Sequence, residues 1–302
     1  PSGGEVLVKG ARPGRDPVPL RRRMAVVFQS PHLLSTTVEK NVAAGLLYRG
    51  ARDAGARVGE SLRRFGIGHL AGRHAGSLSG GEAARVSLAR AFVLDPEIML
   101  MDEPLSALDA PTRAALLDDL EAAIGGQGRA TTVMSTHDIS EALRLATRIA
   151  VIIDGRIAQI GPAAEVRDRP CSEAIARLVG MDNVLPGVVA ARSGEDASIS
   201  IAGRTVTART GIDVGERVLC MIRPEHVQVA ARSDRAGTIE GTVARVIPSA
   251  HVTSILVECG IGLSAVVTTV PTGVGPGTRV SVDLDPCLVH VVRAEGRRPS
   301  QT

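Results

Sequence analysis

Residues 78–82 read Leu-Ser-Gly-Gly-Glu, and residues 98–103 read Ile-Met-Leu-Met-Asp-Glu. A Ser-Gly-Gly turn that opens a helix leaves free backbone N–H groups at the positive end of the helix dipole, which favours a bound phosphate. The S-x-x-E spacing of Ser79 and Glu82 also fits a capping box that needs no ligand. The first stretch therefore leaves both interpretations open.

The second stretch is a run of apolar residues that ends in two adjacent carboxylates, Asp102 and Glu103. A buried strand that presents two carboxylates at its C-terminal end suits Mg²⁺ binding and water activation in phosphoryl transfer. Because Pro104 follows, a polar exit from strand to loop is the structural alternative. Other segments of the chain must decide between them.

Three further segments occur in a fixed order with these two. They are Phe28-Gln29-Ser30, Ser106-Ala107-Leu108-Asp109 and Thr136-His137-Asp138. In this order, between residue 2 and about residue 161, the sequence resembles the ATP-binding subunit of ATP-binding-cassette (ABC) transporters. In that family the segments are the Q-loop, signature, Walker B, D-loop and H-loop. The resemblance implies ATP and Mg²⁺ as cofactors.

The resemblance also implies a role for each motif residue. Glu103 is the expected general base, His137 the sensor of the γ-phosphate, and Gln29 the link between metal, water and membrane partner. Taken alone, His137 and Gln29 are typical of hydrogen-bonding residues without a catalytic role. Asp102 and Gln29 are the expected Mg²⁺ ligands. The residues expected at phosphate or at the subunit contact are Ser79, Gly80, Gly81, Glu82 and Asp109.

One motif of the family is absent from the sequence. A P-loop requires G-x-x-x-x-G-K-[ST], and neither of the two lysines, Lys9 and Lys40, stands in that pattern. Residues 2–8 resemble the turn and strand that follow the P-loop helix. We therefore expect a sequence truncated before the Q-loop, with a natural protein without a P-loop as the alternative. As given, the chain is expected to be inactive alone and to offer its signature to a partner.

Composition limits the other function classes. A net charge of +3, with no Trp, one Tyr and three Phe, leaves almost no surface on which bases stack, so no nucleic-acid partner is expected. The four cysteines form no C-x-x-C pair, which argues against a zinc or redox site. Because no apolar stretch reaches about 18 residues, any membrane role must come from a partner.

Two domains are predicted, because the pattern of residues changes along the chain from mixed helix and strand signals to short strand signals. The first, residues 1–165, is an α/β, P-loop NTPase-like ABC ATPase domain that is incomplete at its N-terminus. A linker, 166–182, precedes an all-β, OB-like barrel at 183–294, and a disordered tail follows at 295–302. In the first domain, strands are predicted at 24–28 and 131–135, and Asp154-Gly155 is the signal of a two-residue hairpin. Short β-branched runs at turn-marked spacing predict the barrel; they lie at 184–189, 198–201, 217–222, 241–247, 254–257, 263–268 and 279–284. Residues 222–227 resemble the TOBE-type regulatory domain of importers.

The predicted function is an ATPase subunit of an importer at the cytoplasmic face of the membrane. Its expected partners are transmembrane permease subunits, a second ATPase subunit in a homodimer and, indirectly, an extracytoplasmic substrate-binding protein. Residues 241–292 look most like the molybdate or tungstate type, so an oxyanion is the first choice of cargo. Sugar, polyamine or ferric iron is the alternative.

Other interpretations remain open at this stage. Ser249, Ser254 and Ser264 are candidate oxyanion donors, although serines at strand ends are more often structural. A cassette without a P-loop, acting as a partner subunit or a ligand sensor, is the second alternative. A non-transport ABC protein of DNA repair or translation is disfavoured, because Gln29 and Ser79 enclose only a compact helical segment.

Overall fold

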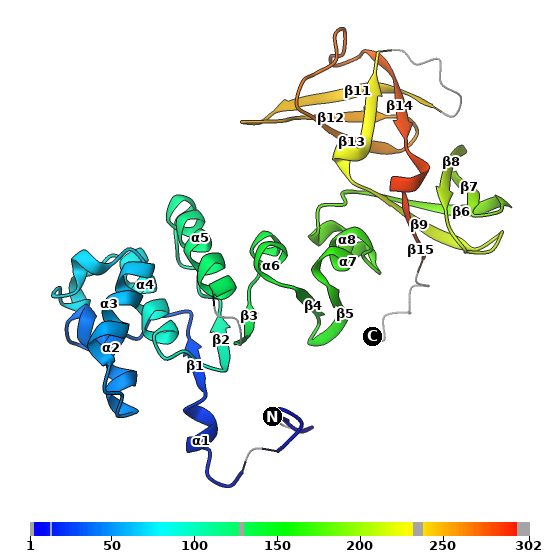
Figure 1. Cartoon of the computed structure of the whole chain (residues 1–302). Helices are drawn as coiled ribbons and strands as arrows, with labels where there is room; N and C mark the ends of the chain where they lie inside the picture. The colour runs from blue at the N-terminus through cyan, green and yellow to red at the C-terminus, as the bar shows by residue number, and fades with distance from the viewer. Residues whose placement is uncertain (1–2, 13, 127–129, 232–237, 295–302) are drawn as a thin grey trace, which may run out of the picture. The chain divides into compact units, whose positions relative to one another are not determined.

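The computed structural model describes residues 3–12, 14–126, 130–231 and 238–294 (Figure 1). The chain divides into two units, Pro1–Leu145 and Ala146–Thr302, and each has its own apolar core. An α/β first domain and an all-β second domain are confirmed. The domain limits at 165/166 and 182/183 stay predictions, and the predicted tail lies outside the described residues.

The first unit is built around a three-stranded sheet. Its strands are β1 (Met24–Val27), β2 (Ile98–Asp102) and β3 (Thr131–Ser135). Its α-helices are α1 (Val18–Arg21), α2 (Val38–Tyr48), α3 (Ala54–Arg64), α4 (Gly80–Phe92), α5 (Ala110–Gly126) and α6 (Ile139–Leu145). Two 3-10 turns, Gly68–Leu70 and Ala75–Ser77, connect α3 to α4. The strand predicted at 131–135 is confirmed, whereas β1 ends at Val27, one residue before its predicted end.

The order of the strands places the motifs at one edge of the sheet. β2 lies between β1 and β3 and pairs in parallel with each of them (Figure 1). The carboxyl ends of parallel strands meet at the same edge. Because Gln29, Glu103 and His137 each follow one of these strands closely, the topology gathers them there.

The two faces of this sheet differ. On one face Ala25, Met99 and their neighbours are buried in the first core with residues of the helices. On the other face Val26, Leu100 and Val133 lie opposite one another across the three strands. Val26 and Val133 are exposed, Val133 by 56%. Within the described residues, the two outer strands of this second face are left uncovered, while Leu100 between them is half-buried.

The second unit is almost entirely β-structure after a short helical segment. It begins with a hairpin, β4 (Arg148–Ile153) and β5 (Arg156–Pro162), followed by α7 (Ala163–Asp168) and α8 (Glu173–Leu178). The predicted two-residue turn Asp154-Gly155 is confirmed, since the φ angles of 50° and 71° are those of a type I′ hairpin.

Ten further strands form two antiparallel five-stranded sheets, with the orders β10-β14-β11-β12-β13 and β15-β9-β6-β7-β8. Their bounds are β6 Asn183–Ser193, β7 Asp196–Ile201, β8 Arg204–Arg209, β9 Arg217–Ile222, β10 Val227–Ala230, β11 Ile239–Pro248, β12 Thr253–Glu258, β13 Gly262–Val267, β14 Arg279–Leu284 and β15 His290–Arg293. Short 3-10 turns, Pro224–His226 and Pro286–Leu288, precede β10 and β15. Apolar residues of both sheets share one core.

A buried amide links the two sheets. The side chain of Asn183 in β6 donates to the carbonyl of Ser264 in β13 at 2.8 Å and accepts from its backbone N–H at 2.7 Å. Asn183 thus satisfies two backbone groups across the sheets, as a strand partner would. The second unit is therefore joined by a polar contact as well as by its apolar core.

The aromatic residues are confined to the first unit: they are Phe28, Tyr48, Phe65 and Phe92. Phe65 and Phe92 pack with ring centroids 5.4 Å apart. Tyr48, the last residue of α2, is 82% exposed. Among the described residues, no helix combines the length and the apolar character needed to cross a membrane.

Candidate active site

Glu103 occupies an unusual backbone position directly after β2. Its φ of 41° lies in the left-handed region, which is uncommon for a residue other than glycine. The backbone N–H of Glu103 donates to the carbonyl and to the hydroxyl of Ser135, at 3.1 and 3.2 Å. Such positions persist where neighbouring contacts hold them, and they cluster at functional sites.

Side chains from the neighbouring strand ends meet on the Glu103 carboxylate. Gln29 donates through Nε2 to Oε2 of Glu103 at 3.4 Å and to Oγ of Ser106 at 3.2 Å. His137 Nδ1 lies 3.3 Å from Oε1 of Glu103. The Glu103 side chain is 32% exposed and that of His137 is 69% exposed. A carboxylate held from both sides and open to solvent can polarise a water molecule.

Asp102 is anchored beside this group. The hydroxyl of Ser135 donates to Oδ1 of Asp102 at 2.6 Å. No described cluster holds three or more His, Cys, Asp or Glu side chains in a metal-binding arrangement. Mg²⁺ is commonly held by one or two carboxylates together with phosphates of the substrate. A cage built from protein alone therefore does not fit, and Asp102 with Gln29 as ligands of Mg²⁺ that arrives with a nucleotide stays a prediction.

Ser79 and Glu82 form the capping box that the sequence allowed. Ser79 Oγ accepts from the Glu82 N–H at 3.3 Å, and Glu82 Oε2 accepts from the Ser79 N–H at 2.7 Å. The backbone and hydroxyl of Ser79 lower the pKa of Glu82, and Arg73 contributes further. The side chains of this stretch are thus used to start α4, so a phosphate would be bound by backbone groups.

The two glycines between them differ in their surroundings. A Cβ on Gly81 would lie 2.6 Å from Cγ2 of Thr112, so the packing of α4 against α5 favours glycine there. A Cβ on Gly80 would meet nothing within 4 Å. Gly80 therefore stands at an open surface, where a ligand or another chain can approach the backbone closely.

Asp109 belongs with the signature residues rather than with Glu103. Its carboxylate accepts from the N–H of Thr112 at 2.9 Å and from the Thr112 hydroxyl at 3.1 Å. These bonds lower the pKa of Asp109. Since Thr112 also faces Gly81, one threonine joins the D-loop to the signature. The predicted residues thus form two groups, one around Glu103 and one around Thr112.

Several residues of the site were not identified from the sequence. Ser106, Thr112 and Ser135 bond to Gln29, Asp109 and Asp102 respectively. For Ser135, its place at the end of β3, level with Asp102 in the sheet register, is a signal that could have found it.

Arg90 was also missed. It donates to the carbonyls of Pro31 and His32 at 2.7 and 2.9 Å, and its burial lowers its pKa. Arg90 therefore ties the segment after Gln29 to α4, the helix that begins with the signature. Helical spacing alone gives no sign of this contact.

Comparison with known proteins shows the family of the chain. Residues 1–106 match the family model described as ABC transporter, and residues 220–292 match that of the TOBE domain. A spermidine/putrescine import ATP-binding protein of Pseudomonas aeruginosa is 35% identical over 259 residues, which cover 80% of this chain and 69% of that protein. The chain belongs to the family of ABC transporter ATP-binding proteins.

Two other similar proteins extend the comparison with this ABC ATP-binding protein. A spermidine/putrescine import ATP-binding protein of Methylococcus capsulatus is 38% identical over 252 residues, covering 80% of this chain but 64% of that protein, less than two thirds of its length. The solved structure of cbiO1 from Clostridium perfringens, part of the ABC transporter complex cbiONQ, has a TM-score of 0.51 and 26% identity. The match covers 61% of this chain and 74% of that one. The oxyanion expected as cargo has no support among the relatives described here.

Proposed function

We propose that this protein is the ATP-hydrolysing subunit of an ABC importer, acting at the cytoplasmic face of the membrane through a permease. The observation that carries the proposal is the meeting of Gln29 and His137 on the Glu103 carboxylate, at 3.4 and 3.3 Å. Residues that follow three separate strands converge on one carboxylate, as a general base and its positioning groups would.

In the proposed mechanism Glu103 accepts a proton from the attacking water. Gln29 and His137 orient its carboxylate, and His137 is exposed enough to reach a bound phosphate. Asp102, held by Ser135, would hold Mg²⁺ together with the nucleotide phosphates. When bound, Mg²⁺ supplies charge neutralisation at the transferred phosphoryl group.

The signature is proposed to act on a second ATPase subunit. Ser79 and Glu82 are occupied by the capping box, while Gly80 is open, so backbone N–H groups at the start of α4 would face the phosphates. Residues 1–302 contain no P-loop motif. The signature therefore requires a nucleotide held by a P-loop outside this sequence, and the link from Thr112 to Asp109 supports a role of the D-loop at the same contact.

For the cargo we propose a polyamine. The P. aeruginosa and M. capsulatus relatives are both named spermidine/putrescine import ATP-binding proteins, which supports the alternative weighed in the sequence over molybdate or tungstate. Uptake of radiolabelled spermidine and molybdate by cells with and without the gene decides between them. Loss of spermidine uptake alone is expected, and loss of molybdate uptake alone would contradict the assignment.

The hydrolytic role is tested by Glu103→Gln in the protein expressed from its natural gene and assembled with its permease. We expect kcat for ATP hydrolysis to fall about a hundredfold or more with ATP binding retained, because the amide cannot accept the proton. Glu121→Gln is the matched control, since Glu121 is an exposed carboxylate on α5 bound to Arg144. An unchanged kcat in Glu103→Gln would remove Glu103 from its role.

A further inference from the structure

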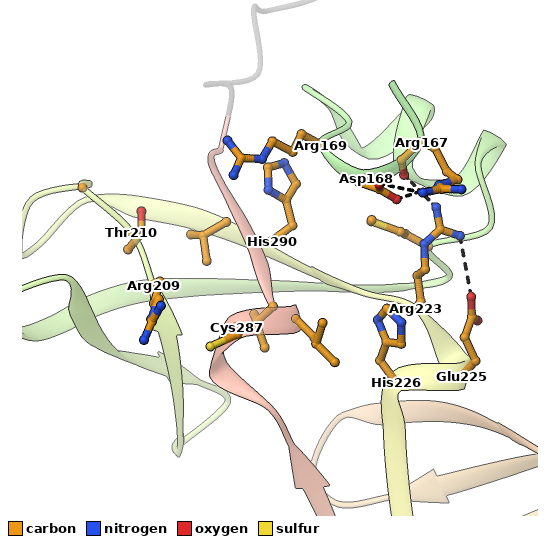
Figure 2. Close-up of a pocket in the computed structure, with 15 residues that line it drawn as sticks. Arg167, Asp168, Arg169, Arg209, Thr210, Arg223, Glu225, His226, Cys287 and His290 are labelled. Atoms are coloured by element: carbon orange, nitrogen blue, oxygen red, sulfur yellow. Dashed lines mark hydrogen bonds and ion pairs between the residues drawn. The ribbon is translucent and has the colours of Figure 1, made fainter. Parts of the chain in front are cut away.

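A cavity in the second unit lies where the C-terminal end of α7 meets β15 and the turn before β10 (Figure 2). Its volume is about 920 Å³, which is within the range of small-molecule sites. Apolar side chains, including Met181, Val289 and Val291, form part of its wall. None of the residues assigned to ATP lines this cavity.

The polar part of the wall is mostly cationic. Four arginines and two histidines line the cavity, against two carboxylates, Asp168 and Glu225. Asp168 pairs with Arg167, which donates to its two oxygens at 2.7 and 2.9 Å. The pairing with Arg167 lowers the pKa of Asp168, and the nearby Arg223 and His226 lower it further.

Arg223 forms the fixed base of the cavity. It donates to the carbonyls of Val179 and Arg167 at 2.9 and 2.7 Å, and its side chain is 13% exposed. Figure 2 shows it rising from its strand end toward Arg167 and Asp168, with Glu225 3.8 Å from its Nη1. Its two carbonyl partners hold the guanidinium in place, and the carboxylate of Glu225 compensates part of its charge.

Arg169, beside His290, is the least compensated charge of the wall. The guanidinium of Arg169 lies beside the ring of His290 in Figure 2. Burial lowers the pKa of His290, the carbonyl of Pro170 opposes that effect through a 3.0 Å contact, and Arg169 lowers the pKa further. Within the described residues, the Arg169 side chain makes no ion pair with a carboxylate. Arg169 thus stands without a described carboxylate partner beside a histidine ring whose lowered pKa favours the neutral form.

We propose that this cavity binds an organic anion of metabolite size, a phosphate ester or a polycarboxylate, with Arg169 as its principal charged contact and Arg223 behind it. Charge-assisted bonds from a guanidinium fork suit phosphate and carboxylate groups, and the apolar wall suits a carbon skeleton. A polyamine would be repelled by this wall, so the cavity is no sensor of the proposed cargo. The inference is independent of the proposed ATPase role.

Binding is tested by calorimetry on the whole chain with citrate and glucose 6-phosphate as probes. We expect at least one of them to bind with a Kd below about 1 mM, and glucose and spermidine not to bind. Inorganic phosphate is expected to bind more weakly because it leaves the apolar wall unfilled. No binding of either probe, or equal affinity for inorganic phosphate, would overturn the proposal.

The contact is tested by Arg169→Ala, which should fold because Arg169 is exposed and makes no side-chain bond in the described residues. We expect the affinity to fall about tenfold or more. Arg177→Ala is the matched control, since Arg177 pairs with Glu173 on α8 and lies outside this cavity. Equal affinity in Arg169→Ala and in the unchanged protein would reject Arg169 as the contact.

Cysteine protection locates the bound anion. Cys287 lines this cavity and Cys171 lines a different one, and both thiols are exposed. Cys220 stays silent because burial raises its pKa to about 12. Citrate should slow modification of Cys287 by N-ethylmaleimide and leave Cys171 unchanged, with the protection lost in Arg169→Ala. Binding without protection of Cys287 would place the anion elsewhere and overturn the assignment.

Discussion

In the first unit, one face of the parallel sheet carries exposed valines, Val26 and Val133. In the second unit, the inward-facing residues of the two sheets pack together in one shared core. Val133 in β3 is 56% exposed, while Val257 in β12 is 0% exposed. No residue of β3 is buried. The same residue type in two strands thus has opposite surroundings.

This difference teaches how each unit is stabilised. Parallel sheets are normally covered on both faces, whereas antiparallel sheets can leave one face in water. Each antiparallel sheet of the second unit buries one face in the shared core, which is all that this architecture requires. The first unit has room on its open face for further polypeptide, from this protein or from another chain. The proposed catalytic side chains lie at one edge of that sheet.

The largest expected effect is on the core of the second unit. Leu263 in β13 is fully buried, so Leu263→Ala should reduce the free energy of unfolding of this unit by about 2–5 kcal/mol. Hydrogen exchange in increasing urea, followed separately in peptides of β11–β14 and of α2–α4, measures each unit. Equal destabilisation of both units would show that they unfold together and would break the comparison.

Buried amides give a matched test across the units. Asn183 bonds to both backbone groups of Ser264, and Asn41 in α2 bonds to both of Leu34 and to the carbonyl of Thr37. Asn183→Ala and Asn41→Ala should each cost about 1–3 kcal/mol, because backbone groups lose their partners. Urea unfolding measures the cost. A negligible cost for Asn41→Ala alone would show that water reaches that site in the first unit.

Helix caps give a smaller contrast. Ser79→Ala removes half of a capping box and should cost about 1 kcal/mol in the first unit. Ser172 caps α8 in the second unit through a single longer bond of 3.5 Å to the Ile175 N–H. Ser172→Ala is therefore expected to cost less, as measured by thermal unfolding. The reverse order would show that the box around Ser79 contributes little to stability.

The smallest expected effect is that of a valine-to-threonine change on the open face of the first unit, and it tests the comparison between the two units most directly. Val133→Thr should change stability by less than about 0.5 kcal/mol in the chain of 302 residues, because the side chain is already exposed. Val257→Thr, the matched control, should cost about 1–3 kcal/mol because its hydroxyl is buried. Urea titrations of both variants provide the measurement. A cost above 1 kcal/mol for Val133→Thr would show that the open face is covered in solution.

Sequence reasoning succeeded where a local pattern carries the information. The cap at Ser79, the strand at 131–135 and the hairpin at Asp154-Gly155 each depend on a few adjacent residues. The strands β8 and β10 were not predicted, because short runs of four to six residues next to turns have a weak period-2 signal. Their pairing with β7 and β14 supplies what the local sequence lacks.

Some features of the candidate site could likewise be predicted from the sequence, and others could not. The gathering of Gln29, Glu103 and His137 follows from their places after parallel strands, so motif order was sufficient to predict it. The left-handed backbone of Glu103 and the contact of Thr112 with Gly81 depend on tertiary packing that no spacing encodes. The role of each residue in catalysis stays a prediction until the variants are measured.

The confinement of the aromatic side chains has an optical consequence. Near-ultraviolet spectra of this protein report the first unit alone, and its only phenol belongs to Tyr48 at the exposed end of α2. The second unit contains no Phe, Tyr or Trp and therefore adds no aromatic signal to these spectra. A Leu288→Trp substitution at the cavity wall would introduce the only indole of the chain, so indole fluorescence would follow events in that unit without a contribution from another tryptophan.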